Sequence, residues 1–221
     1  MDPCRRRGGA MMMAAAGARH AHAWAQRDRI LDAAQQCFAE RGFHGASMAM
    51  IADTARISAG LIYRYFAGKS ELIQGIVHRQ MEWLEGEMKR MESTGGDAVC
   101  RIIESFRDGD CRTGADDQPV RRIEPALVLE IIAESGRDPV IAKAMASFDA
   151  RIDDILESWL ARPRAQGGFG VPAGQLRVRT VVLRALLDGL KMRQTREGEA
   201  LDIDLLSAAL QEALPGLMGT D

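Results

Sequence analysis

The sequence predicts an all-α protein of about nine helices, on three observations. Apolar residues recur every three or four positions along most of the chain, which is the period of an amphipathic helix. Serine, glycine and proline stand where these periodic segments begin or end. No segment shows a convincing alternation of apolar and polar residues, and an apolar content of 47% is enough to form a packed core.

The first helices are predicted in the segment 26–72, from local signals. Gln26 begins a periodic segment that Gly42 ends. Ser47 is placed to cap a short helix over 48–55, and Ser58 to cap a second one over 59–65. Lys69 then opens a long helix that reaches about Thr94. Three short helices joined by tight turns are typical of a helix-turn-helix DNA-binding domain.

The remaining segment, 73–221, is predicted to form a second helical domain. Further helices are expected over 98–108, 123–135, 139–160, 175–196 and 202–217, with loops over 109–120 and 162–174. The helix over 123–135 is apolar nearly all round, so we expect it to be central and buried. The last two helices carry an excess of Val and Leu and are expected to form a homodimer surface. The alternative is that they only complete the core of one monomer.

Residues 1–25 are predicted to be a disordered tail because Ala, Gly, Met and Arg dominate them. The segment imitates a signal peptide, with Arg5 to Arg7 before an Ala/Met stretch. That stretch is short and has no Leu, Ile, Val or Phe, which argues against secretion. The three arginines could reach DNA as a basic arm, although a solvated tail is the favoured interpretation.

Charge and cysteine content limit the classes of function. Residues 1–72 hold ten Arg and Lys against six Asp and Glu, whereas residues 73–221 hold nineteen against twenty-five. Only the first third could therefore face a polyanion. The four cysteines have no C-x-x-C spacing and there are only four histidines, so no metal or cofactor is expected. No apolar run approaches the roughly 20 residues that span a bilayer, and we expect a cytoplasmic protein.

The two tyrosines of the chain mark the expected DNA contact. Tyr63 and Tyr65 lie one residue apart in a short helix, near Ser58, Arg64 and Lys69. Hydroxyls, cations and helix N-termini are the groups that hold DNA phosphates. Taken alone, the tyrosines could be ordinary aromatic residues of a helix bundle. Their spacing to the serine and the lysine favours DNA binding.

The same segment resembles a known family. Residues 27–73 contain Ile51-Ala52, Ala55, Ser58-Ala59-Gly60, Tyr63-Arg64-Tyr65-Phe66, Lys69 and Leu72 in an order similar to that of the tetracycline-repressor (TetR) family. The resemblance implies a bacterial, dimeric, ligand-responsive transcription regulator, most simply a repressor that binds a near-palindromic operator. It places Ser47, Tyr63, Tyr65 and Lys69 at phosphates. At bases or the groove edge it places Ala49, Ser58, Ala59, Gly60, Leu61 and Arg64.

One residue departs from the family pattern. Family members usually have glycine in the turn between the two short helices, where this chain has Arg56. A non-glycine residue is uncommon in a left-handed conformation. Either the turn differs here, or Arg56 gains a phosphate contact that offsets the strain.

The resemblance also implies a cavity for a small ligand in the segment 73–221. The residues that could line it are Trp83, Met88, Ile103, Phe106, Leu127, Glu130, Ile131, Glu134, Phe148, Leu183 and Leu187. Most of these are expected to be plain core. Glu130 and Glu134 lie on an apolar helix, so an internal salt bridge to an arginine, such as Arg101, Arg151 or Arg184, competes with recognition of a cationic or hydrogen-bonding ligand. The sequence otherwise favours an apolar or mixed ligand.

Three other functions remain as alternatives. A transcriptional activator would use the same DNA contacts. A structural DNA-binding protein would need a longer basic zone than the first third provides. A helical enzyme is disfavoured because the sequence offers no Ser-His-Asp, Cys-His or metal-binding constellation, and no histidine follows His78.

Overall fold

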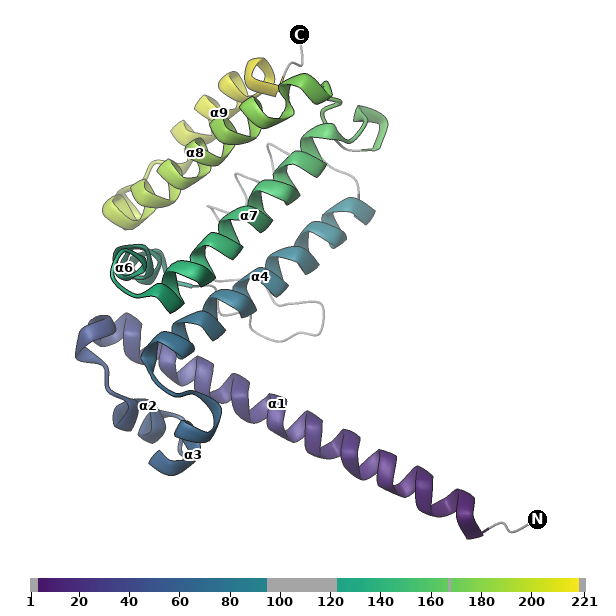
Figure 1. Ribbon diagram of the computed structural model, residues 1–221. Helices are drawn as coiled ribbons and strands as arrows, with labels where there is room; N and C mark the ends of the chain where they lie inside the picture. The colour runs from purple at the N-terminus through teal and green to yellow at the C-terminus, as the bar shows by residue number, and fades with distance from the viewer. Residues whose placement is uncertain (1–3, 95–122, 167, 219–221) are drawn as a thin grey trace. The chain divides into compact units, whose positions relative to one another are not determined.

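The computed structural model describes residues 4–94, 123–166 and 168–218, and every regular element in these ranges is a helix (Figure 1). The all-α prediction is therefore confirmed for the described chain. The residues divide into two compact units, Met1–Leu72 and Ile73–Asp221. The predicted helix over 98–108 and the loop over 109–120 lie outside the described residues.

The first unit packs two short helices against one long helix. It contains α1 (Cys4–Gly45), α2 (Met48–Thr54), α3 (Ala59–Tyr65) and the first turn of α4 (Lys69–Thr94). Contacts join α1 to α2 and α2 to α3, as Figure 1 shows. The helical period of the sequence places the apolar side chains inside, and the residues that form this core include Ile30, Leu31, Phe38, Ile51, Ile62, Phe66 and Leu72.

The long helix breaks where the sequence predicts. Gly42 has φ 71° and ψ 165°, a conformation that essentially only glycine adopts, so α1 kinks there. The beginning of α1 differs from the prediction, because the helix starts at Cys4 rather than near Gln26. The segment 4–25, which was expected to belong to a disordered tail over 1–25, is thus helical. The many Ala and Met residues of this segment are strong helix formers. The segment 4–25 also contains no proline, which would interrupt a helix.

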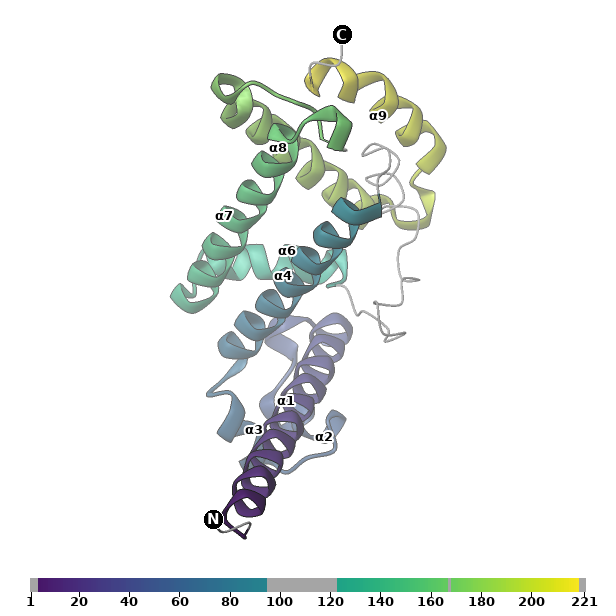
Figure 2. The same cartoon turned by 90° about the vertical axis from the view of Figure 1, so that its right-hand side faces the viewer.

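The second unit is built from α4, α6 (Pro125–Ser135), α7 (Pro139–Ala161), α8 (Ala173–Glu197) and α9 (Ile203–Met218), with two short 3-10 turns. The helix α6 contacts both α7 and α8, and α8 also contacts α9 (Figure 2). Asp138 caps α7, with its carboxylate accepting from the N–H groups of Val140 and Ile141. The bounds of all five helices lie within two residues of the predicted ones.

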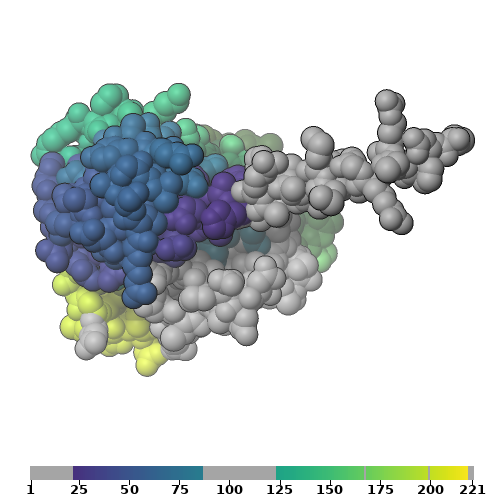
Figure 3. Space-filling model, turned by 90° about the horizontal axis from the view of Figure 1, so that it is seen from below, coloured from purple at the N-terminus to yellow at the C-terminus, as the bar shows by residue number. Residues whose placement is uncertain are grey.

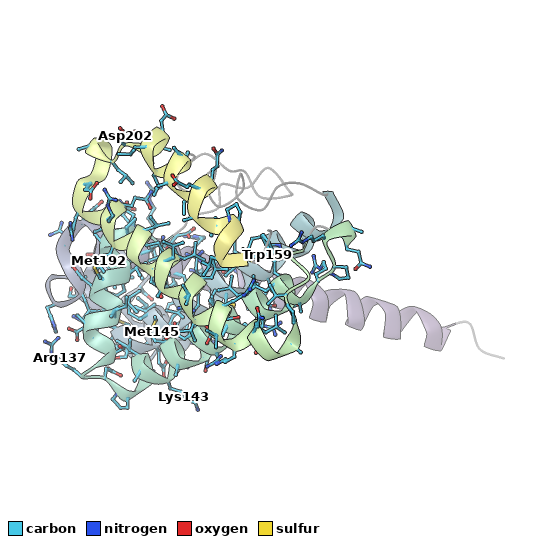
Figure 4. The ribbon with its side chains drawn as sticks, turned by 90° about the horizontal axis from the view of Figure 1, so that it is seen from above. Arg137, Lys143, Met145, Trp159, Met192 and Asp202 are labelled. Atoms are coloured by element: carbon cyan, nitrogen blue, oxygen red, sulfur yellow. The ribbon has the colours of Figure 1, made fainter. Side chains whose placement is uncertain are left out.

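A shared core joins α7, α8 and α9. Its buried residues include Leu156, Trp159, Leu160, Leu183, Leu190, Leu206, Leu210, Leu214 and Met218. Figure 4 looks down on this unit, with Trp159 towards one end of α9 and Asp202 at the other. The Trp159 ring meets Phe169 edge-on at 5.0 Å between centroids, which closes the α7–α8 loop over the core.

Ion pairs fasten α7 to α8 outside this core. Arg184 on α8 reaches Asp149 and Asp153 on α7, and it also pairs with Asp188 one turn along its own helix. Burial opposes the charge of Arg184, but Asp188 and Asp149 outweigh it and raise the pKa of the guanidinium. The arginine therefore stays charged and holds the two helices together.

The prediction that the helix over 123–135 is central and buried is confirmed for only one side of the helix. Leu127, Ile131 and Glu134 of α6 are buried, whereas Ile132 is 50% exposed. The helices α7 and α8 contact α6, and Leu127, Ile131 and Glu134 are buried while Ile132 is left exposed. An apolar residue on the other side then stays in contact with solvent.

Candidate nucleic-acid interface

The two short helices of the first unit begin at serine caps. The Ser47 hydroxyl accepts from the Met50 N–H at 3.2 Å, and the Ser58 hydroxyl accepts from the Leu61 N–H at the same distance. Each cap satisfies one of the N–H groups that a helix leaves without a partner in its first turn. Both predicted caps are confirmed, and the start of α3 is fixed in position.

One face of α3 is buried in the first unit and the other is exposed to solvent. Ile62 and Phe66 are buried, as their spacing of four predicts, and anchor α3 in the unit. Tyr63 is 57% exposed, and Arg64 is exposed beside it. Viewed from below, the blue atoms of the α2–α3 segment face the viewer in Figure 3. The arrangement presents an aromatic hydroxyl and a guanidinium on an outward face.

The other predicted contact residues of the first unit lie around that face. Ser47, Ala49, Ser58, Ala59 and Gly60 are exposed, and Leu61 and Tyr65 are half-buried. No atom lies within 4 Å of where a Cβ on Gly60 would stand. The small residue is therefore not required by packing inside the unit, and it keeps the N-terminal end of α3 thin.

The turn between α2 and α3 is left-handed at Arg56. Arg56 has φ 55°, and it is the non-glycine residue with positive φ in the described chain. Its N–H donates to Asp53 O and the Ile57 N–H donates to Ala52 O, each at 3.0 Å, while Arg29 Nη2 donates to Ala55 O at 2.9 Å. The chain therefore keeps the turn geometry that suits glycine and does not adopt a different turn.

The ammonium group of Lys69 faces the protein. Its Nζ donates to Phe43 O at 2.7 Å and to Ala46 O at 3.0 Å, and it lies 4.7 Å from the centroid of the Phe43 ring. The phosphate contact expected for Lys69 stays a prediction. The sequence could not indicate these two acceptors, because they lie 26 and 23 residues away along the chain.

Comparison with known proteins places this unit in a family. Residues 30–76 match the family model described as bacterial regulatory proteins, tetR family. The chain is 29% identical over 150 residues to the HTH-type transcriptional regulator UidR of Escherichia coli K12, covering 64% of this chain and 67% of that protein. The first unit contains a TetR-family DNA-binding domain, and the chain is a transcriptional regulator. The resemblance of its DNA-binding motif to this family is thereby confirmed.

Two more proteins extend the similarity of this regulator to most of its length. It is 26% identical over 197 residues to the HTH-type transcriptional repressor KstR of Mycolicibacterium smegmatis, covering 89% of this chain and 88% of that protein. The solved structure of Salmonella enterica GusR superposes with a TM-score of 0.65 at 27% identity, covering 88% and 95% of the two chains. The similarity therefore includes the second unit as well as the helix-turn-helix.

The predicted ligand-lining residues that the structure describes lie on four helices. Trp83 is on α4; Leu127, Glu130, Ile131 and Glu134 are on α6; Phe148 is on α7; Leu183 and Leu187 are on α8. Leu183 belongs to the shared core and Leu187 packs against it. The side chain of Met88, and all of Ile103 and Phe106, lie outside the described residues.

The buried carboxylate on α6 has an internal partner. Glu134 Oε1 lies 3.1 Å from Arg137 Nη1, three residues along the chain. A salt bridge to an arginine is therefore present, and its partner is Arg137 rather than one of the three arginines named as examples. Arg151 pairs with Glu85, Arg184 pairs with aspartates of α7 and α8, and Arg101 lies outside the described residues. Glu134 pairs with Arg137 because this arginine lies only two residues after the end of α6 at Ser135.

The described residues offer neither a metal-binding cluster nor a membrane-spanning helix. No group of three or more His, Cys, Asp or Glu side chains in the described ranges could hold a metal ion. No helix there is both long enough and apolar enough to cross a membrane. The buried Cys37 thiol lies 3.4 Å from Thr54 Oγ1 and belongs to the packing of α1 on α2.

Proposed function

We propose that this regulator is a repressor that binds a near-palindromic operator as a homodimer and leaves it when a small ligand binds. One observation carries the DNA-binding part. The helix α3 buries Ile62 and Phe66 and exposes Tyr63 and Arg64, behind a serine-capped N-terminal end. Such a helix can enter a major groove without losing its own packing. We therefore assign 26–72 to DNA binding and 73–221 to ligand binding and dimerisation.

The proposed DNA contacts follow the exposed groups. The hydroxyls of Ser47 and Ser58 accept from backbone N–H groups, which leaves each hydroxyl hydrogen to donate. Ser47, Tyr63 and Tyr65 hold phosphates in this proposal. The groove side is formed by Ala49, Ser58, Ala59, Gly60, Leu61 and Arg64. Lys69 belongs to the same proposed surface, as a further phosphate contact.

Arg56 extends this proposed surface. Its side chain is exposed, and within the described residues no interaction of its guanidinium is found. It stands two residues before Ser58, the cap of the groove-entering helix. A left-handed arginine costs on the order of 1–2 kcal/mol relative to glycine, so a phosphate contact would explain why the chain keeps it.

The proposed dimer surface lies on α8 and α9. Val178 and Leu205 are each 67% exposed, and Val181, Val182 and Met192 are also exposed. Val178, Val181 and Val182 lie three and four positions apart, so they share one face of α8. Exposed valines in a row are costly in a monomer, and a second copy of the same face would cover them.

The proposed switch acts through α4. This helix starts in the first unit and continues without a break into the second. In the second unit Glu85 Oε1 accepts from Arg151 Nε at 2.6 Å, and Gln80 Oε1 accepts from the Ile123 N–H at 3.2 Å. A ligand of apolar or mixed character near Trp83 and Met88 would tilt α4 by displacing these contacts. The ligand must prefer the tilted state.

Sequence selection tests the proposal. The full chain is mixed with a library of random 30-bp duplexes at fixed salt, and the bound duplexes are sequenced. We expect a near-palindromic site whose half-site centres are about 34–36 Å apart or a little more. Arg64→Ala should change the base preference at one position per half-site by about 1–3 kcal/mol. The control Lys143→Ala removes a cation from exposed α7 and should change nothing.

Each outcome of this selection has a meaning. Binding without any enriched sequence would indicate a structural DNA-binding protein. No binding to any duplex would exclude the proposal. We also propose that the protein acts in the cytoplasm, where the DNA of a bacterium lies. We propose no catalytic role for any residue.

A further inference from the structure

The peptide group between Ala55 and Arg56 sets the turn that leads into α3. Its orientation is fixed by the ψ angle of Ala55, which is −7°, and by the φ angle of Arg56, which is 55°. Rotation of this one peptide plane would return Arg56 to a negative φ. It would thereby remove the crowding that makes a left-handed conformation costly for a residue with a Cβ. An interaction that opposes this rotation is therefore needed to keep the turn.

Both polar atoms of this peptide group are held. The Arg56 N–H donates to Asp53 O at 3.0 Å, at the C-terminal end of α2. The Ala55 carbonyl accepts from Arg29 Nη2 at 2.9 Å, and this arginine lies 26 residues earlier, on α1. Rotation of the plane would break both hydrogen bonds at once. Ala55 is 6% exposed, so little water could replace the arginine at its carbonyl.

The guanidinium of Arg29 is itself oriented. Its Nη1 donates to Oε1 of Gln26 at 3.3 Å, three residues back along α1, and Gln26 is buried. The two donor groups of one planar fork therefore have acceptors on two different elements. A cation also suits the last carbonyls of a helix, which no N–H group of that helix reaches. Arg29 thus ties the end of α2 to α1.

These contacts compensate for a residue that suits the turn poorly, since glycine adopts a left-handed conformation without steric cost and arginine does not. We propose that Arg29 holds Arg56 in its left-handed conformation and is thereby a positioning residue for α3. Ser58 caps α3 two residues after Arg56, so a rotated peptide plane would reorient the whole helix. The consequence for DNA rests on the proposed function of α3, whereas the effect on the turn does not.

This role makes the value of the Arg29 hydrogen bond depend on residue 56. With arginine there, loss of the bond frees the peptide plane to rotate, and the turn relaxes. With glycine there, the left-handed conformation persists without help, and only the hydrogen bond itself is lost. Two residues that act independently would instead give the same effect in both backgrounds.

Hydrogen exchange of the free protein measures this dependence. Arg29→Met should speed exchange of the amides over 48–66 about tenfold in the wild-type background, the factor expected for a charge-assisted hydrogen bond. In the Arg56→Gly background the factor should be at most about threefold. The control is Arg27→Met, because the Arg27 guanidinium lies 5.2 Å from the centroid of the Phe66 ring, at the far end of α3. Its effect should be equal in both backgrounds.

DNA binding gives a second readout, with a random 30-bp duplex and the duplex selected by the wild type as probes. The quantity is the ratio of the two affinities, in which a phosphate contact cancels because it serves both duplexes alike. Arg29→Met should lower this ratio at least about fivefold, since a reoriented α3 loses contacts to bases. Adding Arg56→Gly should restore most of the ratio, although both affinities then lack any phosphate contact of Arg56.

Two results would overturn the proposal. One is equal acceleration of exchange by Arg29→Met in both backgrounds, and the other is an affinity ratio that Arg29→Met leaves unchanged or that Arg56→Gly does not restore. Arg29→Lys keeps a cation but cannot reach both acceptors, so it gives the same comparison in milder form where Arg29→Met unfolds the first unit. A wild type that binds no duplex would refute the proposed function alone, because the exchange measurements need no DNA.

Discussion

Replacing Arg56 with glycine should make the DNA-binding unit more stable. Arg56 holds φ 55° in the turn between α2 and α3. A left-handed conformation costs a residue with a Cβ on the order of 1–2 kcal/mol, and glycine avoids that cost. Glycine also loses more entropy on folding, by about 0.5–1 kcal/mol. The middle of the first range minus the middle of the second leaves a gain of about 0.75 kcal/mol for Arg56→Gly, because this exposed side chain makes no hydrogen bond or ion pair within the described residues.

Hydrogen exchange of the full chain measures this gain where it arises. Amides over 48–66 should exchange about three to four times more slowly in Arg56→Gly, the factor that corresponds to about 0.75 kcal/mol. Arg56→Ala is the matched control, since it removes the guanidinium but keeps the Cβ and the strain. It should leave exchange close to that of the wild type. Equal or faster exchange in Arg56→Gly would show that the turn is unstrained, and the argument would then be wrong.

The same pair of variants tests the proposed phosphate contact of Arg56. Both variants lose the guanidinium, so both should lower the salt slope on random DNA by about 0.9. The glycine variant would then be more stable and bind DNA more weakly. An unchanged slope in both variants would leave the strain of Arg56 without a function in DNA binding.

Three further predictions concern caps, core and assembly. Ser58→Ala should cost about 1 kcal/mol of stability in the first unit by urea unfolding, while Ser58→Gly costs only a few tenths; equal losses would contradict a capping role. Thr180 is fully buried on α8 and its hydroxyl has no hydrogen-bond partner in the described structure, so Thr180→Val should stabilise by about 1 kcal/mol, whereas Thr180→Ser, which keeps the hydroxyl, should not. Val181→Glu should yield monomers by light scattering and Ala150→Glu on exposed α7 should not; a monomeric wild type would exclude the proposed dimer.

Local signals explain why most helix boundaries could be predicted. The caps at Ser47, Ser58 and Asp138 act on N–H groups two or three residues away, so their effect is visible in a short window of sequence. The kink at Gly42 and the left-handed turn at Arg56 are local in the same sense. The helical period also identified the buried side chains of α1 and α3, because each of these helices has one face towards the core of the unit and one face towards solvent.

Features that depend on distant neighbours could not be predicted. The apolar pattern of α6 cannot show which of its residues other helices will cover, so the exposure of Ile132 was missed. The carbonyl partners of Lys69 are more than twenty residues away. The partner of Glu134 was missed for another reason, since a distant arginine was expected where Arg137 stands one turn away. The start of α1 was missed because an Ala-rich segment suits either a flexible tail or a helix.

The unbroken course of α4 makes it a lever whose length can be estimated. Sixteen residues separate Lys69 from Glu85, the residue that Arg151 holds. At 1.5 Å per residue this arm is about 24 Å long. A rotation of about 5° around the Glu85 end would move the Lys69 end by about 2 Å, which is several times the tolerance of about 0.5 Å for a precise site. A ligand would therefore need to change the slope of α4 by only a few degrees, and the length of the helix would supply the rest.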